Sequence, residues 1–455
     1  MKKGSVIFFL ICCIIIPGVR AQLFEQSIGA AGNEKNLVIG GYLRSTWFGN
    51  WSNDHTLQHT SFYGQPALTL QSRAGQWGKA YGDIRFRSGF EFGAPVSELE
   101  VREAYVDLNL GWASLRAGKQ ILAWGRADGF NPTDNLTPRN YFVRSPLPDD
   151  MRMGNYALSL NLHPVEALRI ELDYLPRFEP SVYRFDLVNL PDYLNINPVI
   201  RPETNLSNGI WAVKADVILS QIEGSVSYLH GYDLLPALNP GTMPQPPFES
   251  FEVGIIPVTF KQQILGADFA TSIGKTGLRG EIAWRQPDSL FSGYPFMPHS
   301  EWQWSVSLDR SLGAFHLILG YSGKLVESFK AMDTPVIPDP NLLSDPSTWP
   351  YLGSMFENFL EYANRILFDQ TKEWSHILLF RPSVKLFHEV LEAEINSFYN
   401  FSTKEYFIWP GITWHVSDAL NATLGYQYYY GPEFTRLNWV AKMLNGPYLE
   451  FRLTF

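Results

Sequence analysis

The sequence predicts an all-β protein: a transmembrane antiparallel β-barrel of about 18 strands, with about 16 as the alternative count. Two observations lead to this fold class. Segments of about ten residues alternate apolar with polar side chains, and a tilted strand needs this length to cross the hydrocarbon layer. The connections between these segments alternate between short and long, which collects the long connections at one end of the sheet.

The alternation is clear between residues 168 and 174. Leu168, Ile170 and Leu172 alternate with Arg169 and Glu171, which gives one apolar face and one polar face. In a barrel the apolar face contacts lipid and the polar face lines a wet lumen. A secreted soluble β-sandwich or sugar-binding domain shows the same alternation, with the apolar face in its core. Periodicity alone therefore leaves both folds open.

The connection lengths favour the barrel. The expected strands are 37–48, 63–74, 80–92, 98–110, 112–120, 152–163, 167–176, 209–219, 222–232, 255–272, 277–287, 301–310, 313–325, 373–386, 389–400, 404–416, 418–429 and 447–455. The long connections are 49–62, 121–151, 177–208, 233–254, 288–300, 326–372 and 430–446. Tight turns alternate with them. This asymmetry is typical of an outer-membrane barrel with external loops and periplasmic turns, and an even strand count places both termini in the periplasm.

The beginning of the chain has the pattern of a secretory signal peptide, residues 1–21. Lys2 and Lys3 precede a short apolar run, Val6–Ile16, and small residues lead to a cut before Gln22. The run is too short to span a bilayer as a helix. We expect a short periplasmic N-terminal segment over 22–36 and the barrel over 37–455.

Composition narrows the function. Cys12 and Cys13 are the two cysteines of the chain and lie in the signal peptide, so the mature chain has neither cysteine metal sites nor cysteine nucleophiles. The full chain has a formal net charge of −9, and cleavage of the signal peptide removes the basic residues Lys2, Lys3 and Arg20, so that the mature chain is more acidic. No basic field attracts phosphates, which argues against a nucleic-acid partner. The aromatic content of 15 % with 14 Trp is high enough for interfacial belts.

The last strand resembles the C-terminal strand of bacterial outer-membrane β-barrels. Leu449, Phe451, Leu453 and the terminal Phe455 lie on one apolar face. The assembly machinery of those barrels reads a terminal strand of this form. The resemblance implies that Phe451, Leu453 and Phe455 form an assembly signal, with barrel-assembly machinery and outer-membrane lipid as partners.

Residues 116–150 carry the most specific string. Together with Glu103–Leu108 they resemble a signature of a widespread, largely uncharacterised family of Gram-negative outer-membrane barrels that looks related to alginate-export porins. The matching elements are Arg116–Gln120, Trp124–Gly125, Asp128–Gly129, Asn131–Pro132 and Asp134. The resemblance implies the barrel fold, an outer-membrane location and transport or export. It does not imply a substrate, and the strongly basic lumen of alginate-export barrels is not evident here.

We expect the loop after residue 120 to fold inward and narrow the pore, since long loops on barrels are usually functional. The candidate constriction residues are Trp124, Arg126, Asp128, Asn131, Asp134, Arg139 and Arg144. The alternative is a loop that packs on its own aromatic and ion-pair contacts at the barrel rim.

The expected lumen carries charges of both signs. The candidate lumen residues are Arg85, Arg87, Arg116, Arg169, Glu171, Arg279 and Glu281. Such charges pair across neighbouring strands, so no strong preference for anions or cations follows. A neutral or zwitterionic polar solute, or a saccharide that stacks on lumenal rings, fits better than a phosphate.

We expect no catalytic residues, metal site or cofactor. No metal-binding, nucleophile-elbow or phosphate-loop motif is present. His55 and His59 could bind a metal in the first loop, although such a pair is usually without function. Ser375–His376 and His415 are candidates for a barrel enzyme by residue type alone. Helical spacing predicts an amphipathic helix over 354–367, which either covers a loop core or caps the pore.

These features favour an outer-membrane channel that passes a small polar or amphipathic solute, inward by diffusion or outward as the conduit of an exporter with a periplasmic transport partner. Three alternatives stay open. One is a hydrophobic-compound channel in which Leu23–Leu37 enters the lumen. The others are an enzyme on a barrel scaffold and a receptor or adhesin built from the long loops. The sequence determines neither the cargo nor the direction of transport nor the oligomeric state.

Overall fold

A computed structural model describes residues 37–51, 56–182, 184–187, 193–242, 252–291, 294–336, 342 and 344–455. The expected signal peptide and N-terminal segment lie outside these residues. Residues Ile39–Phe455 form one compact unit.

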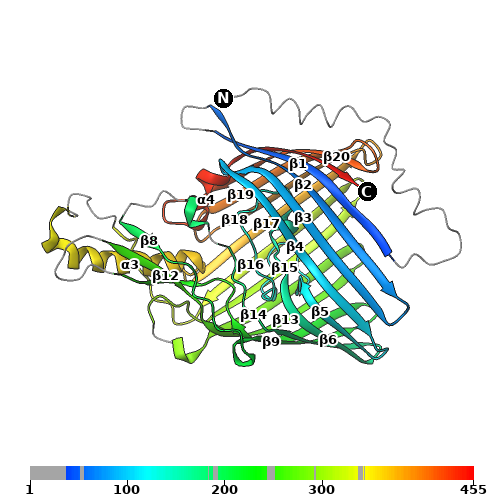
Figure 1. The fold of residues 1–455 in the computed structure, drawn as a ribbon, viewed down its shortest axis with the longest axis horizontal. Coiled ribbons are helices and arrows are strands. Elements are labelled where there is room, and N and C mark those ends of the chain that lie inside the picture. Colours follow the sequence, from blue (N-terminus) through cyan, green and yellow to red (C-terminus); the bar gives the residue numbers. More distant parts are fainter. Residues whose placement is uncertain are drawn as a thin grey trace. The chain divides into compact units, whose positions relative to one another are not determined.

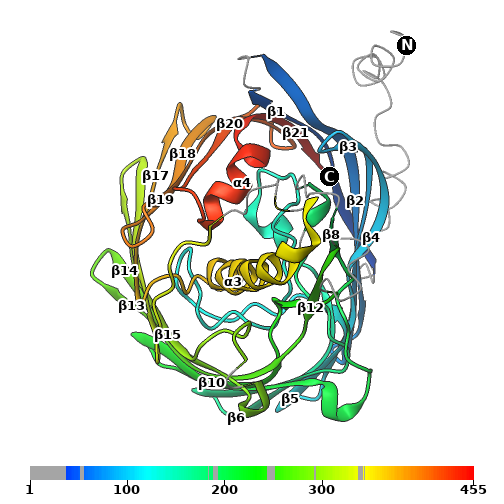
Figure 2. The ribbon, with the colours of Figure 1, turned by 90° about the vertical axis from the view of Figure 1, so that its left-hand side faces the viewer.

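Within the described residues, eighteen strands form one antiparallel sheet that closes on itself, which confirms the expected fold (Figures 1 and 2). Its strands are β1 (Leu37–Trp51), β2 (Leu57–Ala74), β3 (Gly78–Glu91), β4 (Ala94–Asn109), β5 (Ala113–Gln120), β6 (Asn155–Val165), β7 (Leu168–Leu175), β9 (Ile210–Ile218), β10 (Ile222–Tyr232), β13 (Lys261–Ile273), β14 (Thr276–Pro287), β15 (Glu301–Leu312), β16 (Phe315–Val326), β17 (Trp374–Leu386), β18 (Leu391–Asn400), β19 (Glu405–His415), β20 (Leu420–Tyr430) and β21 (Gly446–Thr454).

The first and last strands close the barrel. β1 pairs with β21 in antiparallel register from Tyr42↔Thr454 to Phe48↔Tyr448. The terminal Phe455 extends this seam, because its backbone and that of Gly41 exchange two hydrogen bonds of 3.0 Å. Within the described residues, closure gives each of the eighteen strands two hydrogen-bonded neighbours, as a lipid environment requires. The side chains of the expected assembly signal point outward and are about half exposed: Phe451 at 48 %, Leu453 at 43 % and Phe455 at 55 %.

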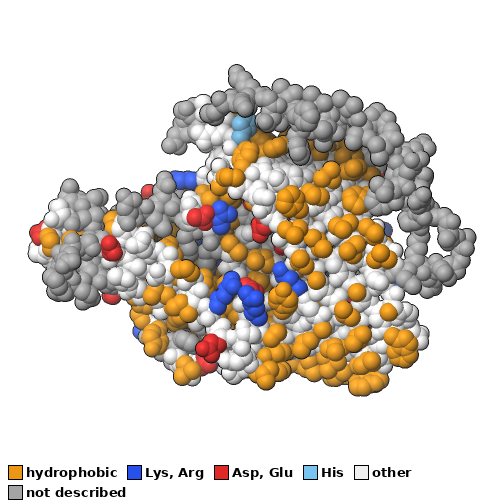
Figure 3. Space-filling view, in the orientation of Figure 1, with side chains coloured by type: hydrophobic (Ala, Val, Ile, Leu, Met, Phe, Trp, Pro, Cys, Tyr) orange, Lys and Arg blue, Asp and Glu red, His pale blue; other side chains and the backbone are white. Residues whose placement is uncertain are grey.

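The outer surface is that of a membrane-spanning barrel. Apolar side chains cover the wall, whereas the charged side chains visible in Figure 3 gather toward the end with the long connections. Exposed aromatic residues form a belt at each end of the wall. The long-connection end carries Tyr156, Trp211, Trp302, Trp374, Tyr399 and Tyr430, and the short-turn end carries Trp77, Trp112, Phe315, Phe387 and Trp414.

Short turns lie at one end of the barrel, as expected: 75–77, 110–112, 166–167, 219–221, 274–275, 313–314, 387–390 and 416–419. Two expected boundaries are wrong. The expected loop 49–62 is mostly strand, because β1 and β2 continue beyond the apolar band, where alternation is not required. The expected strand 255–272 is two strands, because the apolar residues 253–258 pack in a separate small sheet.

That small sheet belongs to a folded cap at the long-connection end. It consists of β8 (Leu194–Ile196), β11 (Ala237–Pro240) and β12 (Val253–Val258), and α3 packs on it. The expected helix is confirmed as α3 (Trp349–Leu367), which lies over the mouth of the ring in Figure 2. A second helix, α4 (Arg436–Leu444), was not expected. The single-turn helices in the described part of the chain are η1 (Pro148–Met151), η2 (Phe185–Leu187), η3 (Leu206–Asn208), η4 (Ser289–Phe291) and η6 (Pro346–Thr348).

Among the described residues, no helix has the length and apolarity needed to cross a membrane.

A charge placed on the outer wall tests the membrane-facing surface. Val306 lies at the middle of β15 and Leu312 at its short-turn end, and both side chains point outward. We expect Val306→Arg to lower the free energy of unfolding in bilayers by about 2–4 kcal/mol and Leu312→Arg by about 0–1 kcal/mol. Urea titration in lipid vesicles measures both. Equal effects at the two depths would contradict the assignment of this face to lipid.

Candidate functional site: the inward segment

The connection between β5 and β6, residues 121–154, folds into the barrel and is called the inward segment. Figure 2 looks along the barrel from its long-connection end and shows this segment, in cyan, crossing the inside of the ring. Its first half follows the wall from β7 to β18. Its second half lies against β1–β4. The expected alternative, a loop that packs on itself at the rim, does not describe this path.

Glu281 on β14 holds the turn at the start of the segment. Its buried carboxylate accepts hydrogen bonds of 2.6 Å from the backbone N–H groups of Arg126 and Ala127, and others from Asn131 Nδ2 at 3.0 Å and Thr133 Oγ1 at 2.8 Å. A buried carboxylate requires such donors, because burial without them is costly. The turn depends on Gly125: its φ is +93°, and a Cβ there would lie 2.5 Å from Glu281 Oε1.

Arg126 joins the segment to two acidic residues of the wall. Its guanidinium pairs with Asp216 on β9, at 2.8 Å, and with Asp268 on β13. The exposed fractions of these carboxylate side chains are only 0 % and 2 %. Burial alone lowers the pKa of Arg126, but the hydrogen bond to Asp216 and the charge of Asp268 raise this pKa above its ordinary value. Arg126 is therefore a fixed cation that neutralises buried acids.

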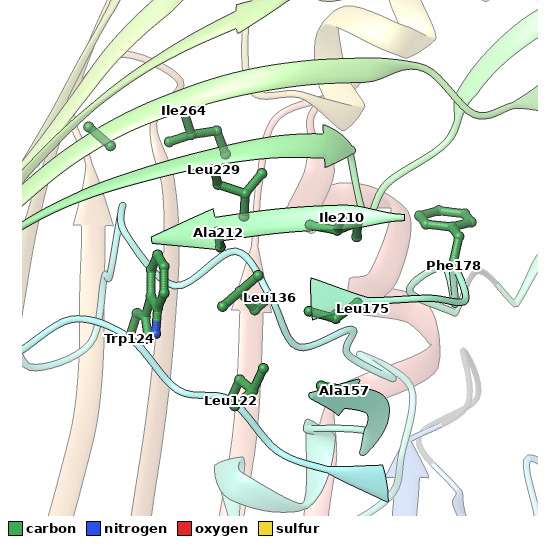
Figure 4. Close-up of a cluster of buried hydrophobic side chains, with 11 residues drawn as sticks. Leu122, Trp124, Leu136, Ala157, Leu175, Phe178, Ile210, Ala212, Leu229 and Ile264 are labelled. Carbon is green, nitrogen blue, oxygen red and sulfur yellow. The ribbon is translucent and has the colours of Figure 1, made fainter. Parts of the chain in front are cut away.

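Trp124 fills an apolar cluster between the segment and the wall. Leu122, Trp124 and Leu136 of the segment point toward Ala212, Leu229 and other wall residues in Figure 4. The indole N–H of Trp124 donates to Glu171 Oε1 at 3.2 Å. This cluster stabilises the segment against the wall without using charge.

The tip of the segment reaches the opposite wall. Asp128 pairs with Arg279 on β14, and Arg279 also lies 3.2 Å from Asp309 on β15. The ring of Phe130 contacts that of Phe398 on β18 edge to face, with 5.6 Å between centroids. The first half of the segment therefore runs along the inner wall from β5 to β18.

Asp150 holds the second half of the segment. Its carboxylate lies 2.6 Å from Arg44 Nη1, 2.8 Å from Arg85 Nη1 and 3.2 Å from Arg102 Nη1, and Ser145 Oγ donates to it at 2.5 Å. Burial acts to raise the pKa of Asp150, but the charge of Arg44 and the Ser145 hydrogen bond outweigh burial. The pKa lies far below its ordinary value. Asp150 is the shared counter-ion of three guanidinium groups.

A β-bulge in β4 contacts both ends of the segment. The pairing of β4 with β3 shifts between Asp83 and Ile84, so that Arg102 and Glu103 both point inward. Glu103 Oε1 accepts a hydrogen bond of 3.0 Å from the N–H of Ile121, where the segment begins. Arg102 donates to the carbonyl oxygen of Asp149 at 2.6 Å, near its end. Bulges commonly redirect side chains next to functional sites.

Arg144 anchors the second half on β1 and β20. Its Nη1 donates to Gln427 Oε1 at 3.2 Å, and its guanidinium lies 4.1 Å from the ring centroid of Phe48. Nε and Nη2 have no hydrogen-bond partner among the described residues. Burial lowers the pKa of Arg144 to about 10.

Asp134 ties the two halves of the segment together. Its Oδ2 lies 2.7 Å from Arg139 Nη2 and 2.8 Å from Arg152 Nη2. Arg139 and Asp134 therefore contact each other, whereas the other candidate constriction residues contact the barrel wall.

The candidate lumen residues all make contacts on the inner side of the wall. Besides the contacts of Arg85, Glu171, Arg279 and Glu281 above, the pairs are Arg87–Glu91 at 2.5 Å, Arg116–Asp107 at 2.6 Å and Arg169–Asp216 at 2.9 Å. Sequence reasoning missed Arg44, Arg102, Asp216 and Asp268 as site residues. Arg44 was detectable, since it alternates with outward apolar residues of β1.

The residues considered for an enzyme or a metal site do not converge. Ser375 is buried on the inner side of β17, whereas His376 contacts Tyr321 and Trp374 on the outer side. His415 lies inside and contacts Asn421. His59 Nδ1 accepts a hydrogen bond from Trp47, and His55 lies outside the described residues. No group of three potential metal ligands occurs in the part of the chain that the structure describes.

The sequence profile of a family described as protein of unknown function (DUF1302) matches residues 40–442. The chain belongs to this DUF1302 family. No curated protein matches the chain.

Solved structures share the DUF1302 protein's fold. OccK5 (OpdH) of Pseudomonas aeruginosa is 10 % identical, with 93 % of this chain and 99 % of that chain covered and a TM-score of 0.53. A BenF-like porin of Pseudomonas fluorescens Pf-5 is 9 % identical, with 93 % and 100 % covered and a TM-score of 0.54. OccAB3 of Acinetobacter baumannii is 8 % identical, with 92 % and 99 % covered and a TM-score of 0.53.

Removing the charge of Asp150 tests how the segment is held. Asp150→Asn removes the carboxylate that the buried Arg44 and Arg102 share with the partly buried Arg85, and we expect the free energy of unfolding to fall by about 3–5 kcal/mol. The matched control is Asp149→Asn, whose side chain is 78 % exposed, with an expected loss of about 0–1 kcal/mol. Urea unfolding and proteolysis within 121–154 measure both variants.

The pH dependence has a defined sign. Because the pKa of Asp150 is lowered by folding, its stabilisation is complete above the unfolded value of about 3.9 and is lost as the pH falls through the folded pKa. The difference between wild type and Asp150→Asn should stay constant from neutral pH to about pH 5 and decrease only in stronger acid. A difference that already disappears near pH 6 would argue against the three-arginine contact.

Proposed function

We propose that this protein is an outer-membrane channel for small polar or amphipathic solutes, in which the inward segment narrows the lumen. The observation that carries the proposal is the segment's attachment to opposite sides of the inner wall, through Arg126 on one side and Asp150 on the other. A segment fixed at both halves is a rigid constriction, whereas a free loop would be displaced by the solute. The similarity to a BenF-like porin supports the proposal through the fold.

The barrel size is compatible with this function. Barrels of about 16–18 strands are wide enough to leave an aqueous channel, so selectivity requires an inner structure that narrows them. Most of the inner charges that contact the inward segment are paired, although no ion pair of Arg144 or Asp173 occurs among the described residues. Partly exposed inner charges occur with both signs: Arg169, Arg279, Asp128 and Glu223. Paired charges of both signs favour a solute without a large net charge.

The proposed channel could work in either of two directions of transport. Inward diffusion of the solute needs only the channel. Service as an export conduit needs a periplasmic partner at the short-turn end, and the expected relation to alginate-export barrels belongs to this form. Whichever the direction of transport, we also expect the barrel-assembly machinery to recognise Phe455. The hydrophobic-compound alternative depends on Leu23–Leu37, whose first fourteen residues precede the described part of the chain.

Replacing 126–148 by a short Gly-Ser linker tests the constriction. We expect the single-channel conductance in planar bilayers to rise at least about twofold, because the narrowest part of the lumen is removed. Arg126→Gln is a milder second variant that releases the turn at residue 126 from Asp216 and Asp268 and should increase current fluctuations. A mobility difference between boiled and unboiled samples on a gel shows that each barrel is folded. An unchanged conductance of the folded linker variant would refute the assignment, and a folded wild type without conductance would refute the channel.

A further inference from the structure

Four aromatic rings lie in contact where the tip of the inward segment meets the inner wall. We call Phe130, Phe398, Phe407 and Tyr429 the aromatic row. The ring centroids are 5.6 Å apart for Phe130 and Phe398, 5.6 Å for Phe398 and Phe407, and 5.0 Å for Phe407 and Tyr429. The row therefore continues from the segment across three neighbouring strands, β18, β19 and β20.

Strand register produces this row. Phe398 lies directly opposite Phe407, and Phe407 lies directly opposite Tyr429. Their strand neighbours Tyr399, Ile408 and Tyr430 are exposed on the outer wall, so the three rings point inward. An aromatic residue at an inward position of a wet lumen needs a reason, because polar residues usually occupy such positions.

Packing alone does not explain the row. Three nearby inward rings, those of Phe48, Trp409 and Tyr448, are buried against one another and form a small core. The four rings of the row are only partly buried, and Phe407 contacts that core from its edge. The row is therefore an apolar surface next to the core rather than part of it.

An exposed ion pair lies on the same inward face as the row, four residues or roughly 13 Å along β18 from Phe398. Glu394 and Asn396 precede Phe398 on the same inward face of β18, and Arg381 of β17 donates to Glu394 Oε2 at 2.7 Å. The side chains of Arg381 and Glu394 are 44 % and 32 % exposed. The pair thus offers a donor and an acceptor side by side without net charge, which suits a neutral polar group that both donates and accepts.

We propose that the aromatic row binds a small solute with an aromatic ring and a neutral hydrogen-bonding head, such as an amide or a hydroxyl group. The ring contacts Phe398 and Phe407, and the head points along β18 toward Asn396 and the Arg381–Glu394 pair. This inference rests on the proposed channel function and specifies its solute class. A carboxylate head fits less well, because Glu394 repels it.

Measurements of current blockade test whether binding depends on the aromatic ring of the solute or only on its apolar surface. Benzamide and cyclohexanecarboxamide have the same head and similar size, but only benzamide has an aromatic face. In planar bilayers with the full mature chain, we expect benzamide to interrupt the current at concentrations about two- to tenfold lower, because ring–ring contacts exceed plain apolar burial by this order. Equal blockade by the two amides would overturn the inference and leave the channel function intact. Stronger blockade by benzoate than by benzamide would overturn the neutral head.

Variants locate the site. Phe398→Leu and Phe407→Leu keep apolar side chains and remove the rings, and each should abolish the preference for benzamide. Tyr399→Leu, on the outer face of the same strand, is the matched control and should retain it. Saturation-transfer NMR of benzamide with detergent-solubilised protein gives a readout that needs no conductance. Transfer that is unchanged in Phe398→Leu and Phe407→Leu would overturn the site, whereas a wild type that binds without conducting would refute only the channel.

Discussion

The structure depends on complete pairing of the backbone in a wall that faces hydrocarbon. Each unpaired N–H or C=O group in lipid costs several kcal/mol, so a membrane sheet has to close. The seam from Tyr42↔Thr454 to Phe48↔Tyr448 meets this requirement, and Phe455 extends it to the last residue of the chain. Closure also encloses the inward face, whose charged side chains then have to find partners inside the barrel.

The inward segment supplies many of those partners. In one part of the inner wall, on β1, β3 and β4, Arg44, Arg85 and Arg102 converge, and the segment brings Asp150 to them. In another part of the inner wall, on β9 and β13, Asp216 and Asp268 are almost completely buried, and the segment brings Arg126 to them. A segment placed in the opposite sense would put like charges together, which is strongly unfavourable in a poorly solvated interior. Charge complementarity therefore determines both the position and the direction of the segment.

The sequence predicted what the bilayer imposes and missed what tertiary contacts decide. The strand number followed from alternation and connection length, since hydrocarbon thickness limits both. Contacts such as Arg44–Asp150 join residues far apart in the chain and have no local signal. The bulge at Arg102 and Glu103 interrupts the alternation, so a pattern based on strict alternation cannot locate it. The aromatic row depends on register between strands, which single-strand patterns do not contain.

Because the inner charges are largely compensated, the net charge of the chain does not predict which solutes the channel prefers. A formal charge of −9 would suggest a preference for cations, but the charges next to the inward segment are largely compensated by direct partners. A compensated ion pair produces a weak field at a distance and acts mainly through hydrogen bonds at contact. Discrimination between solutes then depends on shape, hydrogen-bonding groups and apolar surface. The inner wall provides such an apolar surface at Phe398 and Phe407, where the tip of the segment meets β18.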